Sequence, residues 1–326
     1  ELARASLAKA NIDVRGVHDR MELAGAAFAP MMVGMGSTSD FPHILENIAR
    51  KSMLKGYDEV EETFEAWTSR GSLSDFKISK RVDINTFPSL KRVEEGEEYS
   101  YATIGDRGVM LALATYGRMF SITRQTIIND DLSALGRVPR KMGRAARRTV
   151  GNLVYAVLVD NPKFVDDVAL FHADHKNLGA GAAPSIATFQ AASTAMMLQE
   201  EKNEDGELIK LGIRLRFVIN GPQTQWTIKS VLEAEADPDG KHAKVPNTVR
   251  GMVAPITEHR IADGRYVFAA DPAMHDTVEV SYLDGNDRPY LENRVGWSID
   301  GTEWKVRIDA GVNPLDFRAL YMNPGA

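Results

Sequence analysis

The stretch from Glu94 to Asn161 constrains the fold more than any other part of the chain. It opens with an acidic, glycine-centred run from Glu94 to Glu98 and passes through a turn signal at Ile104 to Gly108. A strand pattern follows, and then a long helical pattern that begins after an Asp pair and ends before Pro162. This order needs no active site. It predicts an arm that leaves a compact body, returns as a strand and joins a rigid helix.

The returning strand is predicted from alternation of apolar residues, because Val109, Leu111 and Leu113 are separated by Met110 and alanines. This strand is the second half of a predicted long β-hairpin from about Pro88 to Arg118, which follows an extended segment ending at Pro88. An isolated two-stranded ribbon is marginally stable in water, and an exposed apolar ribbon tends to aggregate. We therefore predict that the hairpin projects onto a neighbouring copy, and that its apolar face is exposed in a single subunit.

The helical pattern carries two stripes. One is apolar and runs from Leu132 to Val157 at spacings of three and four. The other, which we call the basic stripe, consists of Arg137, Arg140, Lys141, Arg144, Arg147 and Arg148. Like charges on one helix face repel each other unless anions face them, and acidic segments occur at Asp58 to Glu65 and at Glu94 to Glu98. We predict that the stripe pairs with carboxylates, within or between subunits, rather than with DNA.

Pro139 is predicted to lie in the first turn of the main helix, after a separate short turn over 131–136.

Assembly contacts are therefore predicted at three places, the acidic tip, the apolar strand face and the basic stripe. The residues are Glu94, Glu95, Glu97, Glu98, Val109, Leu111, Leu113, Arg140, Arg144 and Arg148.

Residues 1–70 are helix-leaning and carry little apolar surface for a core of their own. One helix is predicted to start at Asp40, with Pro42 in its first turn, and a further acidic helix runs from Asp58 to Trp67. We expect this arm to pack mostly against other subunits.

The rest of the chain mixes helices and strands, which predicts an α+β fold. Helices are expected at 185–202 and 222–234, and strands at 216–220, 265–269, 278–283 and 304–308.

Composition excludes several classes of protein. A net charge of −6 argues against a chain devoted to nucleic-acid binding. The absence of cysteine excludes disulfides, thiolate metal sites and a cysteine nucleophile. No apolar run is long enough to span a membrane. No nucleophile elbow, phosphate loop or dinucleotide fingerprint is present, so no catalytic residue and no cofactor is predicted.

Two alternatives compete with a structural role. His172, Asp174 and His175 form a cluster that resembles the ligands of a metal-dependent hydrolase. The histidines lie in a loop rich in Gly and Ala without an obvious third ligand, so we expect no metal site. The basic stripe could instead belong to a DNA-binding module, although no aromatic side chains are interleaved with it.

Three motifs resemble a known family. The segments 99–108 and 114–125, and the closing run from Trp304 to Gly311, are similar to those of the Mu-like phage major head subunit family. This resemblance implies a tailed-phage major capsid protein with the Hong Kong 97-type fold. It also implies the division of the chain into an N-terminal arm (1–70), an extended loop with peripheral-domain strands (71–130), a spine helix with peripheral domain (131–180), a mainly axial domain (181–290) and a return to the peripheral domain (291–326).

The function implied is a virion shell subunit that assembles in the bacterial cytoplasm into the hexamers and pentamers of an icosahedral shell around double-stranded DNA. DNA contact would be non-specific. Portal, scaffold or protease and decoration proteins are further implied partners, and no membrane is involved. In such families a scaffold or protease segment is commonly removed, which would explain why this chain starts at Glu1.

Overall fold

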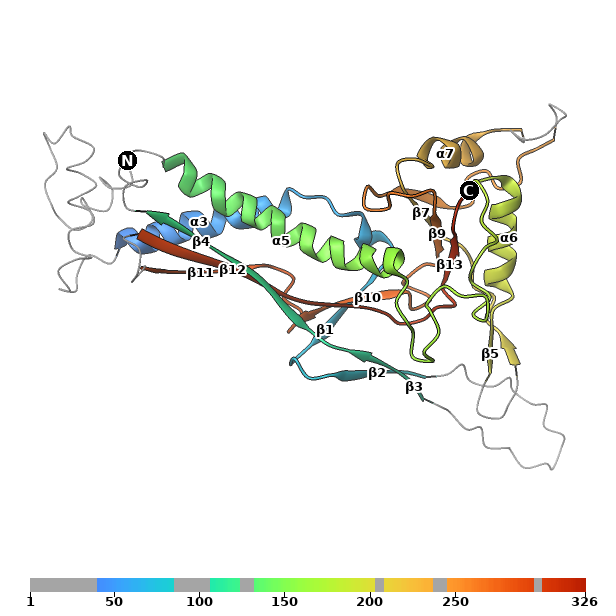
Figure 1. The fold of residues 1–326 in the computed structure, drawn as a ribbon, viewed down its shortest axis with the longest axis horizontal. Coiled ribbons are helices and arrows are strands. Elements are labelled where there is room, and N and C mark those ends of the chain that lie inside the picture. The colour runs from blue at the N-terminus through green and yellow to red at the C-terminus, as the bar shows by residue number, and fades with distance from the viewer. Residues whose placement is uncertain (1–39, 85–105, 124–131, 203–207, 237–244, 296–300) are drawn as a thin grey trace, which may run out of the picture. The chain divides into compact units, whose positions relative to one another are not determined.

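The computed structural model describes residues 40–84, 106–123, 132–202, 208–236, 245–295 and 301–326 (Figure 1). The chain divides into two compact units. Unit 1 comprises the chain up to Glu62 together with Thr115–Val150 and Asp287–Asp309. Unit 2 comprises Thr63–Ala114, Gly151–Asn286 and Ala310–Ala326.

Unit 1 combines two helices with a small sheet. The helices are α3 (Asp40–Asp58) and the first part of α5 (Leu132–Asp160). The strands are β4 (Ala114–Thr123), β11 (Tyr290–Val295) and the first part of β12 (Gly301–Pro314). Both β11 and β4 pair with β12, and β11 runs antiparallel to it. The predicted Asp40 helix and the 304–308 strand are thus confirmed.

The core of unit 1 lies between these helices and the sheet. Its buried members are Ala49, Met53, Leu291, Trp304 and Val306. The Trp304 ring also stacks on the ring of Phe120, with 6.3 Å between the ring centroids. An alternating strand thus places Trp304 and Val306 inward while their neighbours face solvent.

Glycines let α3 and α5 approach closely. A Cβ atom on Gly143 of α5 would lie 2.0 Å from the carbonyl oxygen of Met53. Reciprocally, a Cβ on Gly56 of α3 would lie 2.1 Å from the carbonyl oxygen of Arg140. Each helix therefore presents bare backbone where the other helix crosses it.

α5 is one helix, so the predicted break before Pro139 is wrong. Proline inside a helix removes one backbone hydrogen bond and costs roughly 3 kcal/mol. The Pro139 ring is buried. Its burial, with that of Ala146 and Val150 on the same face of α5, offsets this cost and keeps the helix continuous. The predicted apolar stripe is not that face, because Ala145 is exposed and Met142 and Thr149 are only half-buried.

Unit 2 is built around a four-stranded sheet in the order β13-β9-β7-β8. Its strands are β7 (Phe217–Asn220), β8 (Ala254–Thr257), β9 (Tyr266–Ala269) and β13 (Leu320–Asn323). Helices α6 (Ile186–Met197) and α7 (Gln225–Glu233) bury their apolar sides in the same core. These elements confirm the helices and strands predicted in this region.

The Ser185 hydroxyl caps α6, where it accepts a hydrogen bond from the backbone of Thr188. The helix ends at Met197, earlier than the predicted 202, because β5 (Glu200–Lys202) follows and pairs with β6 (Leu208–Lys210).

In unit 2 the sheet that contains β12 continues with β10 (Val278–Leu283) and β1 (Ser69–Leu73), so its order is β1-β10-β12-β11 with β4 also paired to β12. β10 pairs with β1 in parallel and with β12 in antiparallel orientation. The ribbon of unit 2 consists of β2 (Ser79–Ile84) and β3 (Asp106–Leu111), which pair antiparallel. The predicted hairpin is thus present at its base, and its outer part, 85–105, lies outside the described residues.

The predicted exposure of the strand face is wrong. Val109, Leu111 and Leu113 are 7%, 1% and 6% exposed. They pack in their own chain with Leu73 and Leu315, among others. Alternation determined which side chains share a face, but the partners that cover that face come from distant parts of the chain. The other side of β3 is the exposed one.

The predicted acidic helix over residues 58–67 is also wrong. α3 continues to Asp58, and a short 3₁₀ helix, η1 (Thr63–Ala66), follows. Phe64 and Trp67 are 2% and 0% exposed, so the described part of this segment packs within its own chain. The expectation that residues 1–70 pack mostly on other subunits fails for this part, since two large aromatic anchors outweigh its acidic surface. Residues 1–39 lie outside the described range.

No helix in the described ranges is long and apolar enough to cross a membrane.

Candidate functional site

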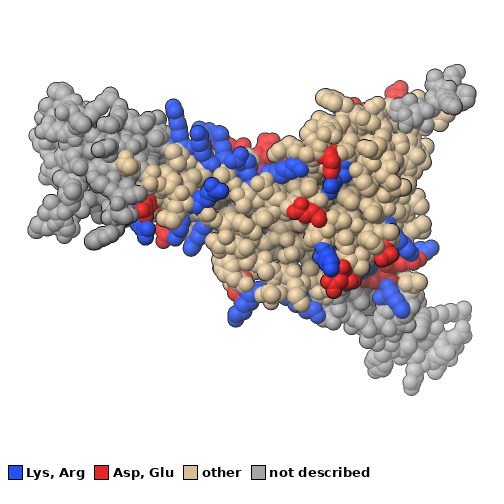
Figure 2. Space-filling model, in the orientation of Figure 1, with Lys and Arg blue, Asp and Glu red and all other residues tan. Residues whose placement is uncertain are grey.

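The basic stripe forms a continuous cationic surface on α5. Figure 2 shows Lys and Arg side chains gathered along this helix. Arg137, Lys141, Arg144 and Arg148 are exposed, whereas Arg140 and Arg147 are partly covered. We call Arg140, Arg144 and Arg147, which contact α3 or the residues after it, the inner side of the stripe, and the other three cations its outer side.

The inner side binds a carboxylate of the same chain. Arg140 and Arg144 both donate hydrogen bonds to Glu59, with Nη2 of Arg144 at 2.7 Å from Oε2. These bonds lower the pKa of Glu59 from its ordinary value of 4.5 to about 2. The same contact raises the pKa of Arg140. Glu59 belongs to the predicted acidic segment, so pairing of the stripe with a carboxylate is confirmed for these two arginines.

Arg147 contacts Tyr57 instead. Its guanidinium lies 5.0 Å from the centre of the tyrosine ring, and Nη1 donates to the hydroxyl at 3.2 Å. The Tyr57 hydroxyl in turn donates to the carbonyl of Asp287 at 2.6 Å. This chain of contacts fixes the inner side of the stripe in unit 1. The acidic tip, Glu94 to Glu98, lies outside the described residues.

A groove of about 480 Å³ runs beside the stripe in unit 1. Met142, Ala145 and Thr149 of α5 form one wall, and residues of β4 and β12 form the other. Its lining contains Arg118 and Arg307 but no His, Asp or Glu. The groove therefore lacks the His, Asp and Glu side chains that most often act as general acids and bases, and Tyr116 is its one lining residue of that kind.

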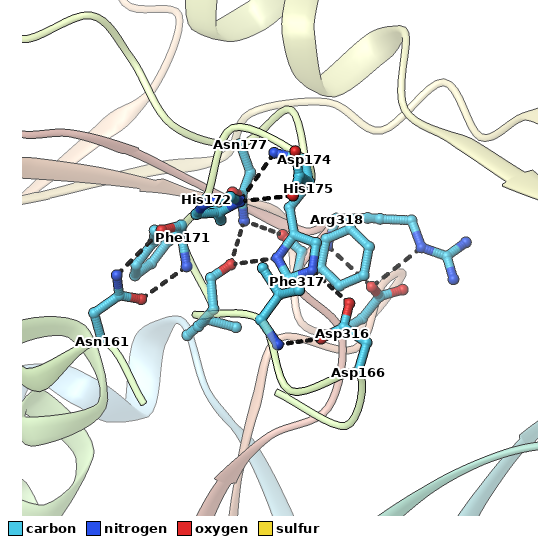
Figure 3. A network of polar contacts seen from close by, with 12 residues as sticks. Asn161, Asp166, Phe171, His172, Asp174, His175, Asn177, Asp316, Phe317 and Arg318 are labelled. Atoms are coloured by element: carbon cyan, nitrogen blue, oxygen red, sulfur yellow. Dashed lines mark hydrogen bonds and ion pairs between the residues drawn. The ribbon is translucent and has the colours of Figure 1, made fainter. Parts of the chain in front are cut away.

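The loop that follows α5 in unit 2 contains the predicted histidine cluster (Figure 3). His175 is 5% exposed. Its Nδ1 lies 3.0 Å from the carbonyl oxygen of Leu170, and its Nε2 lies 2.7 Å from Oδ2 of Asp166. The imidazole also stacks on Phe317 with 3.9 Å between ring centres. Both ring nitrogens of His175 are thus used within the protein.

His172 does not join His175 at a common site. Its Nδ1 accepts a hydrogen bond from the backbone N–H of Asp174 at 3.2 Å, which is a local turn contact. Within the described ranges, no three His, Asp or Glu side chains are grouped as metal ligands. The geometry does not support the metal-dependent hydrolase alternative.

Asp166 is the partner of His175 that sequence reasoning missed. Burial raises the pKa of Asp166, but hydrogen bonds from His175 and from the backbone of Val168 outweigh it, so the pKa is lowered overall. The carboxylate therefore stays ionised beside the imidazole.

Amide side chains complete this network. Asn177 donates to the carbonyls of Leu170 and Phe317 at 2.8 and 3.2 Å and accepts from the backbone of His172 at 3.0 Å. Asn161, at the end of α5, bonds the backbone of Phe171 in both directions. The loop is thereby tied to the chain segment before β13. Within this network, sequence reasoning had singled out only His172, Asp174 and His175.

A buried ion pair lies next to the network. Arg318 Nη1 is 3.0 Å from Oε1 of Glu201, and the two side chains are 8% and 7% exposed. It joins β5 to the C-terminal segment. All these groups satisfy one another, so the arrangement stabilises the fold rather than presenting reactive atoms.

Comparison with known proteins distinguishes the structural role from the hydrolase and DNA-binding alternatives. Residues 108–323 match the family described as Phage capsid protein. The chain belongs to this phage capsid family. The match covers α5, the four-stranded sheet and the network around His175.

Solved phage capsids share the fold. The capsid of cyanophage P-SCSP1u matches with a TM-score of 0.55 at 11% identity, over 82% of this chain and 88% of that one. Microbacterium phage Oxtober96 gives 0.52 at 11% identity, over 82% and 93%. The capsid of Ralstonia phage GP4 gives 0.52 at 13% identity, over 78% and 87%. The search of curated proteins found no match.

The α+β structure is therefore a Hong Kong 97-type phage capsid fold. This capsid protein has a structural role rather than a catalytic one, and its copies build the multimeric shell of a virion.

Proposed function

We propose that this capsid protein assembles into hexamers and pentamers of an icosahedral shell through its basic stripe, which receives acidic segments of neighbouring copies. The family match over residues 108–323 carries the role in the shell. The stripe is the proposed site of contact between copies, because its outer cations Arg137 and Lys141 are exposed on α5.

The acidic partner is the segment Glu94 to Glu98 of a neighbour. Individual exposed ion pairs contribute little, about 0–1 kcal/mol each. A shell repeats the contact at every subunit, and multivalency turns weak contacts into a stable assembly. Opposite charge also directs encounter and register.

Finer assignments belong to the same proposal. The motif similarity of 99–108 and 114–125 supports the Mu-like head subunit subfamily. Assembly would take place in the host cytoplasm, with portal, scaffold or protease and decoration proteins as further partners and non-specific contact to packaged double-stranded DNA. In this scheme the chain keeps the five-part division into arm, extended loop, spine, axial and returning segments.

DNA contact by the stripe is the second candidate. The exposure of Arg137, Lys141 and Arg148 favours it. It predicts steeply salt-dependent binding of DNA by unassembled subunits.

Charge reversal at the outer side of the stripe tests the proposal. Arg137→Glu combined with Lys141→Glu leaves the contacts to Glu59 intact, so the subunit should fold while shell formation, seen by negative-stain electron microscopy, is lost. The matched control is Lys229→Glu with Arg250→Glu, two surface cations of unit 2 that lie near Glu233 and Glu235. Normal shells from the stripe variant, or equal loss in the control, would refute the stripe as an assembly contact.

A further inference from the structure

The ribbon of β2 and β3 is held on unit 2 by one of its faces. On that face Val109 and Leu111 are buried against the apolar cluster around Leu73. On the opposite side Met110 is 71% exposed, and Ile78, just before β2, is 69% exposed. The contacts of one face must therefore determine how the ribbon stands on the body of the unit.

Apolar contact alone does not fix a direction. The hydrophobic effect is proportional to buried area and has no angular preference. Two side chains such as Val109 and Leu111 would stay buried after a rotation or a small slide of the ribbon. A two-stranded ribbon is also too weak to hold its own geometry. A directional contact is needed.

Arg81 of β2 supplies that contact. It lies directly opposite Val109 in the ribbon register, and so points to the same face. Its Nε donates to Oε2 of Glu279 at 2.9 Å, and its Nη2 donates to Oε1 at 2.8 Å. The hydrogen bond to Glu279 raises the pKa of Arg81. A planar guanidinium that binds both carboxylate oxygens fixes angle as well as distance.

Glu279 is a fixed anchor for this fork. It lies on β10, which is paired on one side by β1 and on the other by β12. Its side chain is 5% exposed. Ser281 donates a further hydrogen bond to Oε1 at 2.5 Å. Gly71 of β1 leaves room for the carboxylate, because a Cβ there would lie 1.8 Å from Oε1.

Burying a carboxylate without a cation costs free energy, so the pair favours ribbon orientations that keep Arg81 next to Glu279. If the ribbon turned, Glu279 would keep only the hydroxyl of Ser281 and would lie buried without Arg81. Orientations that separate the two are therefore disfavoured by more than the loss of a surface ion pair. Because the ion pair joins β10 to the β2–β3 ribbon, it can hold the ribbon in one orientation.

We propose that the Arg81–Glu279 pair is a directional lock that fixes the angle of the β2–β3 ribbon on unit 2 before the subunit meets its neighbours. The lock is a property of the single chain. Its consequence, that a subunit with a correctly directed ribbon assembles efficiently, rests on the proposed function.

Spin labelling tests the lock directly, because the chain has no cysteine to interfere. Met110→Cys on the exposed side of the ribbon and Ala191→Cys on the exposed side of α6 carry the two labels in the unassembled full-length chain. With Arg81 and Glu279 unchanged, the distance between the two labels should show one narrow distribution. Arg81→Lys keeps the charge but loses the fork, and it should broaden the distribution or add a second distance.

Two further variants make the result decisive. Glu279→Gln keeps the shape of the anchor and should broaden the distribution in the same way, with circular dichroism showing that both variants fold. Lys77→Gln, an exposed cation before β2, is the matched control and should leave the distribution narrow. A narrow, unshifted distance in both Arg81→Lys and Glu279→Gln would overturn the lock.

Electron microscopy of the same proteins separates the lock from its consequence. Shells from the unlabelled parent with few shells from Arg81→Lys would support the link to assembly. A broadened ribbon with normal shells would uphold the lock and refute the link. Failure of the parent to form any shell would refute the proposed function and leave the distance result unaffected.

Discussion

Two arginines share one carboxylate at Glu59, and this residue shows how charge is distributed on the spine helix. Arg140 and Arg144 sit one turn apart on α5, and both donate to it. The shared anion relieves their mutual repulsion. The acidic segment and the cationic stripe are both visible in the sequence. Which of several glutamates meets the stripe follows from where α3 ends.

The low pKa of Glu59 predicts a pH dependence of stability. The pKa of Glu59 is about 2 in the folded state, below the ordinary 4.5. The ionised Glu59 carboxylate therefore stabilises the fold fully above pH 4.5, and this stabilisation is lost as the pH falls toward 2. Glu59→Gln should therefore lower the urea midpoint of unfolding at pH 7, and the difference from the parent should shrink between pH 4.5 and 3. Glu61→Gln, an exposed neighbour, is the control. A difference that stays constant over this range would contradict the role assigned to the ionised carboxylate.

At the scale of elements, alternation and helical period located strands and helices well. They could not tell which face of a strand is covered. Val109 and Leu111 are buried because Leu73 of β1 and Leu315, just after β12, lie against them. Likewise, an acidic helix over 58–67 was a reasonable interpretation of local propensity, but the burial of Phe64 and Trp67 decided the local structure.

The crossing of α3 and α5 gives a prediction at this scale. Replacing Gly by Ala inside a helix usually stabilises by roughly 0.5–1 kcal/mol. At Gly143 the added methyl would meet the backbone of Met53, and at Gly56 that of Arg140. Gly143→Ala and Gly56→Ala should therefore each destabilise the protein, by about 1–3 kcal/mol as for other overpacked sites.

Chemical denaturation with circular dichroism detection measures this effect. Ala145→Ser, at an exposed position of α5, is the control and should change the stability by no more than about 0.5 kcal/mol. If Gly143→Ala stabilised the protein, the close approach of the two helices would not hold in solution.

At the scale of the whole molecule, the chain is a capsid protein whose surface must meet many copies of itself. Its net charge is −6, yet α5 gathers six cations on one side. This separation of charge favours oriented association of like subunits over random aggregation. The polar groups around His175 serve the interior of unit 2 instead, and the stripe is the surface for which we propose contacts between copies.

Salt should weaken assembly of the unaltered protein. The Debye length falls from about 10 Å at 0.1 M salt to about 3 Å at 1 M, so contacts between exposed charges are screened. Light scattering should show less shell formation at 1 M than at 0.1 M sodium chloride, while circular dichroism shows the same folded subunit at both. Equal or greater assembly at 1 M would indicate that apolar contacts dominate.

The order and type of most elements, the charge of the stripe and the absence of cysteine chemistry all follow from the amino-acid sequence. These properties depend on periodicity and composition, which are local. The tertiary structure alone decided the fate of the histidine cluster, the covered face of β3 and the Arg81–Glu279 pair. Each depends on partners far apart in sequence: His175 on Phe317, Val109 on Leu315, and Arg81 on Glu279. A local pattern cannot name such partners, because only the folded chain brings them together.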